Sequence, residues 1–155
     1  MKKNDSIWKP LLLLVLFMSS FQAVKAESVV YFFIDFRFWN SEYNFQVNGE
    51  KAFSLNPEGK PVVEGGAIMY NMVMRKVVFK QSDSYIISVD CPSNHGTYHA
   101  DLNLHLDDGE TYYVVVNATL KSNFLMTTLD EKKGLKLLKK AQKNKKYTIN
   151  DDYIY

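Results

Sequence analysis

The single cysteine of this chain and all three of its histidines lie between Cys91 and His105, in the stretch CPSNHGTYHADLNLH. Two kinds of chemistry could use these side chains. A nucleophilic pair would need Cys91 as a thiolate and His95 or His99 as its general base. A metal site would need several ligands within a few ångströms of one ion. The stretch is therefore the first candidate for a catalytic or metal site.

The spacing of the histidines disfavours a metal site. On an extended strand, His99 and His105 would lie about 20 Å apart, at about 3.3 Å per residue. His99 and Asp101 share a strand face, but a neighbouring strand would have to supply a third ligand, and the sequence identifies none. The alternation of His99, Asp101 and His105 with leucines is typical of the solvent-exposed face of a strand. We predict no metal and no cofactor, with a metal site at His99 and Asp101 as the alternative.

The environment predicted for Cys91 disfavours a nucleophile. In SYIISVDC, every second residue from Tyr85 to Cys91 lies on the same, more apolar strand face. Free cysteine is among the most frequently buried residue types, and a reactive thiolate needs an accessible, electropositive environment. We therefore expect Cys91 to be a buried thiol in the hydrophobic core.

No other part of the sequence carries a recognisable catalytic motif. It has no Gly-x-Ser-x-Gly elbow, no His-Glu-x-x-His pair and no phosphate-binding glycine loop. The prediction is that the protein is not an enzyme, and the alternative is a metal-dependent or Cys/His enzyme that uses residues 91–105.

Alternating and apolar runs fill most of the chain from residue 28 to residue 129 and predict strands. Residues 28–39 are largely apolar on both faces, as in a central strand. In YNFQVNGEKAFSL, the Asn48-Gly49 pair tolerates positive φ and predicts a tight hairpin. Residues 97–106 alternate most cleanly, and DDGE separates them from the apolar residues 111–120, so we expect these two segments to pair as a hairpin. Residues 62–80 fit neither period well, and we expect strands there.

The pattern changes to that of a helix near residues 130–144. Asp130 and Glu131 stand where a helix N-terminus favours negative charge, and Leu135, Leu138 and Ala141 follow at near-helical spacing. We expect the leucines to pack on the sheet and Gly134 to weaken the helix. The last residues, 147–155, are expected to be a C-terminal tail or a late edge strand.

About seven short strands followed by one helix predict an all-β domain. The fold expected is an antiparallel β-sandwich of immunoglobulin-like or transthyretin-like type with one short C-terminal α-helix. The segments VVYFFIDFRF, FQVNGEKAFSL, SYIISVDC, LHLDDGETYYVVV and MTTLDEKKGLKLLKK occur in this order. This succession resembles a bacterial family of small exported β-sandwich domains of unknown function, in which a strand ending in Gly-Glu-Thr-Tyr-Tyr-Val recurs.

The resemblance implies a prealbumin-like sandwich and no assigned activity. Many members of that family carry a lipid-anchor cysteine, and this sequence has none near residue 26, so membrane anchoring does not carry over. The first 26 residues have the three parts of a secretory signal peptide: lysines, the apolar run from Leu11 to Met18, and Val24 and Ala26 before the cleavage point. We expect export to a periplasm or the medium, no transmembrane segment, and one domain over residues 27–146.

Charge is distributed unevenly along the expected mature chain. Residues 1–26 hold 4 of the 19 basic and 1 of the 17 acidic residues, so the remainder has a net charge of −1. This balance argues against a nucleic-acid partner. Residues 132–146 nevertheless carry eight lysines and no acidic residue, a charge of +8. This segment could dock on the acidic remainder of the chain, or it could meet anionic lipid or an acidic partner.

A second candidate contact is aromatic, because Trp39 and Tyr43 are expected in or beside a loop, where exposed rings can form a platform for a glycan or a peptide. The full candidate binding surface consists of Trp39, Tyr43, Lys132, Lys133, Lys136, Lys139 and Lys140. The function predicted is a secreted, non-catalytic binding or assembly module of a bacterial cell envelope, whose partner is an envelope protein, a glycan or an anionic lipid surface. The alternative for the lysine-rich segment is a peripheral membrane binder through residues 132–146.

Overall fold

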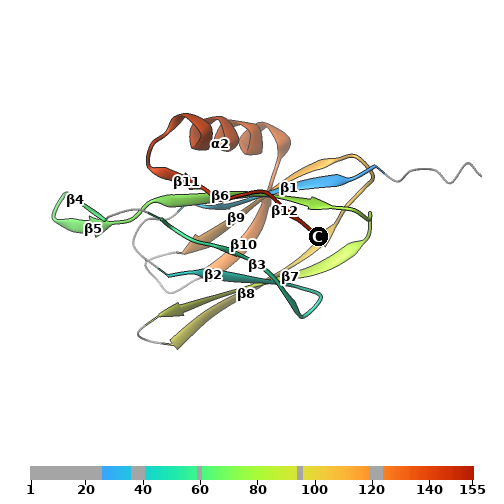
Figure 1. Cartoon of the computed structure of the whole chain (residues 1–155), viewed down its shortest axis with the longest axis horizontal. Helices are drawn as coiled ribbons and strands as arrows, with labels where there is room; N and C mark the ends of the chain where they lie inside the picture. The colour runs from blue at the N-terminus through green and yellow to red at the C-terminus, as the bar shows by residue number, and fades with distance from the viewer. Residues whose placement is uncertain (1–25, 36–40, 59–60, 94–95, 119–123) are drawn as a thin grey trace, which may run out of the picture.

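The computed structural model describes residues 26–35, 41–58, 61–93, 96–118 and 124–155, and most of them lie in strands (Figure 1). A six-stranded sheet consists of β1 (Ser28–Ile34), β6 (Met72–Phe79), β9 (Thr111–Ala118), β10 (Phe124–Leu129), β11 (Tyr147–Ile149) and β12 (Tyr153–Ile154). A four-stranded sheet consists of β2 (Tyr43–Val47), β3 (Glu50–Leu55), β7 (Ser84–Ser93) and β8 (Gly96–His105). The one helix within these ranges is α2 (Glu131–Lys143). The prediction of an all-β protein with a short C-terminal helix is confirmed.

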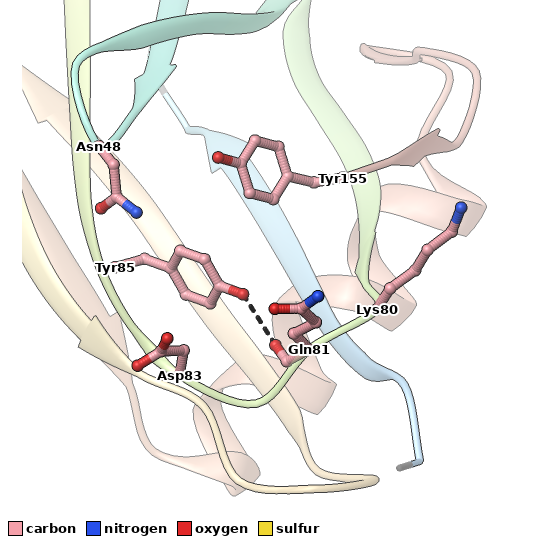
Figure 2. A pocket seen from close by; sticks show the side chains of 6 residues that line it. All are labelled: Asn48, Lys80, Gln81, Asp83, Tyr85 and Tyr155. Carbon is pink, nitrogen blue, oxygen red and sulfur yellow. Dashed lines mark hydrogen bonds between the residues drawn. The ribbon is translucent and has the colours of Figure 1, made fainter. Parts of the chain in front are cut away.

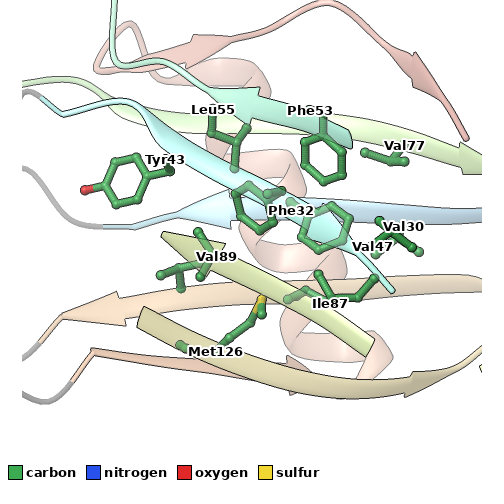
Figure 3. Close-up of a cluster of buried hydrophobic side chains, with 14 of the residues drawn as sticks. Val30, Phe32, Tyr43, Val47, Phe53, Leu55, Val77, Ile87, Val89 and Met126 are labelled. Atoms are coloured by element: carbon green, nitrogen blue, oxygen red, sulfur yellow. The ribbon is translucent and has the colours of Figure 1, made fainter. Parts of the chain in front are cut away.

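Both large sheets contribute to one hydrophobic core (Figure 3). The ring of Phe32 on β1 lies 5.2 Å from that of Phe45 on β2 and 5.1 Å from that of Phe53 on β3, measured between centroids. Alternation along each strand explains this arrangement, because every second side chain points to the same face. Phe32 and Phe45 are fully buried, so the two sheets are joined by aromatic packing.

The strand β1 lies inside the six-stranded sheet and is buried on both faces. Its neighbours are β6, to which it runs antiparallel, and β9, to which it runs parallel. Val30 and Phe32 face the core between the sheets, whereas Phe33 belongs to a second cluster beneath α2. The central strand predicted for residues 28–39 is therefore present over Ser28–Ile34, and residues 36–39 lie outside the described residues.

Strand direction corrects one prediction. A purely antiparallel arrangement is wrong, because β1 pairs with β9 in parallel and both β11 and β12 pair with β6 in parallel. Parallel neighbours need a long crossover connection, so the local turn signals that predict hairpins give no indication of them.

The predicted hairpin between residues 97–106 and 111–120 is also wrong. The strand β8 pairs with β7 instead, from Ser84 opposite His105 to Ser93 opposite Gly96, while β9 belongs to the other sheet. The turn after β8 connects the four-stranded sheet to the six-stranded sheet. The Ser28 hydroxyl of β1 donates a hydrogen bond to the Asp107 carbonyl in this turn at 2.6 Å and so fixes the turn to the six-stranded sheet. The predicted inward and outward faces of residues 97–106 are nonetheless confirmed by burial.

The hairpin predicted at Asn48-Gly49 is present between β2 and β3, with positive φ at both residues. The ambiguous residues 62–80 form strands: β4 (Val62–Glu64) and β5 (Ala67–Met69) make a separate hairpin that projects from the sheets, and β6 follows (Figure 1). Of the two alternatives for residues 147–155, the structure shows an edge strand, because β11 and β12 both pair with β6.

The helix α2 lies across the outer face of the six-stranded sheet (Figure 1). Its N-cap is Asp130, whose carboxylate accepts a hydrogen bond from the backbone N–H of Lys133 at 2.9 Å. Leu138 and Ala141 pack on the sheet as predicted, and so does Leu137. The prediction for Leu135 is wrong, because it does not belong to the cluster beneath the helix and is 37% exposed.

Gly134 brings α2 close to the sheet. It is buried, and a Cβ atom at this position would lie 2.1 Å from Cγ of Tyr113 on β9. Glycine has a low helix propensity, as the sequence predicts, but its missing side chain is what allows the helix to approach β9 this closely. No helix of the described residues is long and apolar enough to span a bilayer.

Candidate binding surfaces

The first candidate from the sequence, His99, takes part in an ion-pair network on the solvent-exposed face of β7 and β8. Its Nδ1 lies 2.7 Å from Asp90 and its Nε2 lies 3.0 Å from Asp101. The hydrogen bonds that His99 donates to the carboxylates of Asp90 and Asp101 raise the pKa of this histidine. A hydrogen bond from Ser88, together with His99, lowers the pKa of Asp101. Both ring nitrogens are thus occupied by carboxylates, as in an exposed salt bridge.

Metal binding gains no support from this network. Among the residues that the structure describes, no group of three or more His, Cys, Asp and Glu side chains is placed to hold an ion. The sequence prediction that His99 and Asp101 share a strand face is correct, but their contact is with one another.

A second group, Ser84, His105 and Asp107, has the composition of a hydrolytic triad. The Ser84 hydroxyl lies 2.9 Å from His105 Nδ1, and His105 Nε2 lies 3.6 Å from Asp107. The side chains of His105 and Asp107 are 67% and 68% exposed. A triad carboxylate works from a buried position, where it orients the imidazole. This open cluster has no such orienting carboxylate and is best described as surface hydrogen bonding.

The thiol of Cys91 is buried, as predicted, with none of its surface exposed. Burial raises the pKa of this thiol to about 11. His99 cannot serve as its base, because Cys91 belongs to the core between the sheets while the side chain of His99 is 52% exposed on the opposite face. The other proposed base, His95, lies outside the described residues. The Cys91–His99 pair is therefore excluded by the position of the two side chains.

The predicted aromatic platform is wrong for Tyr43. This side chain is only 1% exposed and stacks on Phe124 of β10, with the ring centroids 6.4 Å apart. The signal for burial was present in the sequence, because Tyr43, Phe45 and Val47 alternate along one strand face. Trp39, the other predicted member of the platform, lies outside the described residues.

The lysines of residues 132–146 are divided between ion pairs and solvent. Lys133 pairs with the N-cap Asp130 at 2.8 Å, Lys140 pairs with Asp35 at 3.2 Å, and Lys146 pairs with Glu64 at 2.9 Å. The remaining five lysines have no acidic partner within 4.0 Å in the described parts of the chain: Lys132, Lys136, Lys139, Lys143 and Lys145.

Lys140 has a structural role at the edge of α2. Besides its ion pair with Asp35, its ammonium group lies 5.6 Å from the ring centroid of Tyr147, within cation–π range. The hydroxyl of Tyr147 donates a hydrogen bond to the same carboxylate. Burial and the hydrogen bond to Asp35 both raise the pKa of Tyr147. Lys140 thus helps to fix α2 on the sheet and is less available to a partner than the sequence implies.

Four of the unpaired lysines form a single stripe along the outward face of the helix. Lys132, Lys136, Lys139 and Lys143 follow one another at intervals of three or four residues, the spacing that places side chains on one face. The exposed Leu135 lies beside the stripe, three residues after Lys132 and four before Lys139. Beside this stripe, a groove of about 390 Å³ has Leu129 and Leu137 in its lining, together with Lys133, Lys136 and Lys140.

Comparisons with known proteins found no matching family model, no matching curated protein and no matching solved structure. The chemistry of the described surfaces is therefore the basis for a functional proposal. The lysine stripe combines three of the predicted lysines, Lys132, Lys136 and Lys139, with Lys143.

Proposed function

We propose that the protein is a non-catalytic binding module whose contact surface is the outward face of α2 and whose ligand is an anionic lipid surface of the cell envelope. The lysine stripe, defined by Lys132, Lys136, Lys139 and Lys143, carries this proposal. Its four charges remain unpaired in the described structure even though the rest of the mature chain is acidic. The carboxylates of the protein therefore neutralise only some of the lysines of residues 132–146.

The shape of the stripe favours an extended ligand. A helix of 13 residues is about 20 Å long, and the stripe runs along most of that length. Extended anionic surfaces attract basic side chains by about 1 kcal/mol each, so four lysines contribute about 4 kcal/mol at low ionic strength. Leu135, exposed beside the stripe, adds an apolar contact at the level of the headgroups.

The proposed architecture behind this surface is an exported β-sandwich of immunoglobulin-like or transthyretin-like type. Two sheets that share one core support the sandwich, and the signal-peptide pattern of residues 1–26 supports export. The strand β1 begins at Ser28, two residues beyond the expected cleavage after Ala26. Cleavage there would leave the described strands intact.

Vesicle sedimentation tests the proposed contact. Wild-type protein should be retained by vesicles that contain phosphatidylglycerol at low salt, and it should be released by high salt or by purely zwitterionic vesicles. Lys136→Glu with Lys139→Glu should weaken retention by about thirtyfold or more, because two favourable charges are lost. These two positions are preferable to Lys140, which holds α2 in place.

The matched control is Lys51→Glu with Lys80→Glu, which changes the net charge equally at exposed positions away from α2. It should bind anionic vesicles much more tightly than the stripe variant. No retention of the wild-type protein at low salt, or equal loss in the two double variants, would contradict the proposal. Thermal unfolding followed by circular dichroism checks that both variants are folded.

A further inference from the structure

A polar cavity lies at one end of the two sheets, and none of the lysines of the stripe lines it. Its lining comes from three separate segments: Asn48 in the β2–β3 turn, the β6–β7 region and the C-terminal Tyr155. Tyr155 packs on Phe79 and Tyr85, with ring centroids 5.3 and 5.8 Å away. Of these three rings, those of Tyr85 and Tyr155 form the apolar part of the cavity wall.

The cavity has a volume of about 380 Å³, within the range typical of small-molecule sites (Figure 2). Six residues line it: Asn48, Lys80, Gln81, Asp83, Tyr85 and Tyr155. Of these, Tyr85 is buried and Tyr155 is half-buried. The other four are exposed polar or charged residues that reach the same space.

Internal hydrogen bonds fix three of the lining side chains. The Asn48 Oδ1 accepts from the backbone N–H of Ile86 at 2.9 Å, and the Asp83 Oδ1 accepts from the N–H of Ser84 at 2.7 Å. The Tyr85 hydroxyl donates to the carbonyl of Gln81 at 2.9 Å, as the dashed line in Figure 2 shows. Preorganised side chains of this kind lose little entropy when a ligand binds.

Four of the lining side chains keep a polar atom for a ligand. Within the described residues, the Nδ2 of Asn48, the Oδ2 of Asp83, the side-chain amide of Gln81 and the ammonium group of Lys80 have no hydrogen-bond partner. Donors and acceptors are therefore both present. The single positive charge of Lys80 is balanced by the single negative charge of Asp83, so the cavity is selective for neither a strong anion nor a cation.

Mixed donors and acceptors around an aromatic ring suit a polyhydroxylated ligand with one apolar face. We propose that this cavity binds a hexose unit of a glycan. The carboxylate of Asp83 accepts from one ring hydroxyl, and the amide of Asn48 donates to a hydroxyl oxygen nearby. The ring of Tyr155 packs against the C–H face of the sugar. This site shares no residue with the lysine stripe.

Nuclear magnetic resonance with ¹⁵N-labelled protein and a panel of methyl hexosides tests the site. The methyl glycosides of glucose, galactose, mannose and N-acetylglucosamine are the probes. We expect at least one of them to shift the signals of Asn48, Gln81 and Asp83 in a saturable manner. Asp83→Asn keeps the oxygen that accepts from Ser84 and removes the charge, and it should weaken binding about tenfold.

Lys145→Ala is the matched control, because it alters an exposed charged residue outside both the cavity and the lysine stripe and should leave the dissociation constant unchanged. Tyr155→Leu keeps apolar packing on Phe79 while removing the aromatic ring, and it should also weaken binding. The proposal is overturned if none of the four glycosides shifts the cavity signals at millimolar concentration. It is likewise overturned if Asp83→Asn and Tyr155→Leu, both still folded by circular dichroism, bind as tightly as the wild type.

Discussion

Replacement of Gly134 by alanine separates helix propensity from helix packing. On propensity alone, alanine inside a helix is favoured over glycine by about 1 kcal/mol. At this position, however, the new Cβ atom would lie 2.1 Å from Cγ and 2.7 Å from Cβ of Tyr113. Carbon atoms in normal contact are about 3.5–4.0 Å apart. Either the helix or the tyrosine must therefore move by about 1 Å or more.

Neither partner can move freely. Cβ of Tyr113 is attached to the backbone of β9, so a change of rotamer relieves only the contacts of the ring. The helix is fixed by the Asp130 cap and by the ion pair of Lys140 with Asp35. Overpacking of a core costs about 1–3 kcal/mol. We expect the cost of Gly134→Ala to lie in the upper part of that range, because Cβ of Tyr113 cannot move without the backbone of β9. After the gain in propensity, the free energy of unfolding should fall by about 1–2 kcal/mol.

Urea unfolding followed by circular dichroism measures this change. Lys136→Gly, at an exposed position of the same helix, gives the propensity effect without packing and should cost about 0.7 kcal/mol. In a Tyr113→Ala background, the Gly134→Ala penalty should shrink because the ring contacts are gone. If Gly134→Ala instead raises the free energy of unfolding by about 1 kcal/mol, the close approach of α2 to β9 is refuted.

Two further predictions follow from the pKa shifts. Burial raises the pKa of Cys91 from 9.0 to about 11, so the thiolate fraction at pH 8 should be about 100-fold lower in the folded protein than in the unfolded chain. A disulfide reagent should therefore react far more slowly with the native protein than with protein in 8 M urea. Equal reaction rates would contradict the burial of this thiol. The raised pKa of His99 means that its ion pairs stabilise the folded protein below the unfolded pKa of about 6.5, and that this contribution is lost as the pH rises through the folded value. The lowered pKa of Asp101 means that the stabilising contribution of this carboxylate is lost at low pH, as the pH falls through the pKa of Asp101 in the folded protein. The free energy of unfolding, measured with urea from pH 4 to pH 8, should therefore contain a contribution from these exposed ion pairs of less than about 1 kcal/mol in the wild type. This contribution should be absent in His99→Gln. Identical pH profiles for the two proteins would contradict a stabilising role of these ion pairs.

Local signals in the sequence predicted local structure well. The hairpin at Asn48-Gly49 is encoded by two residues that accept positive φ, and the burial of Cys91 follows from alternation along one strand. The same alternation places Tyr43 beside Phe45 in the core, so its burial was also predictable. In each case the information lies within a few residues of the feature.

Features that join distant segments could not be predicted in this way. The parallel pairing of β1 with β9 depends on a crossover between the sheets, and no turn motif records it. Packing of Gly134 on Tyr113 depends on the distance between α2 and the sheet. The helical spacing of apolar residues in the sequence gives no information on this distance. The polar cavity draws its lining from Asn48, Asp83 and Tyr155, three segments whose proximity exists only in the folded chain.

The central place of β1 also bears on when the molecule can fold. This strand is synthesised early, yet its neighbour β6 begins at Met72 and its neighbour β9 begins at Thr111. The last pair of its parallel ladder joins Ile34 to Val116, so the ladder cannot be completed until most of the chain exists. Contacts so distant in sequence slow folding. We expect a nascent chain to remain unfolded until late in synthesis, which is the state that the proposed export across a membrane would require.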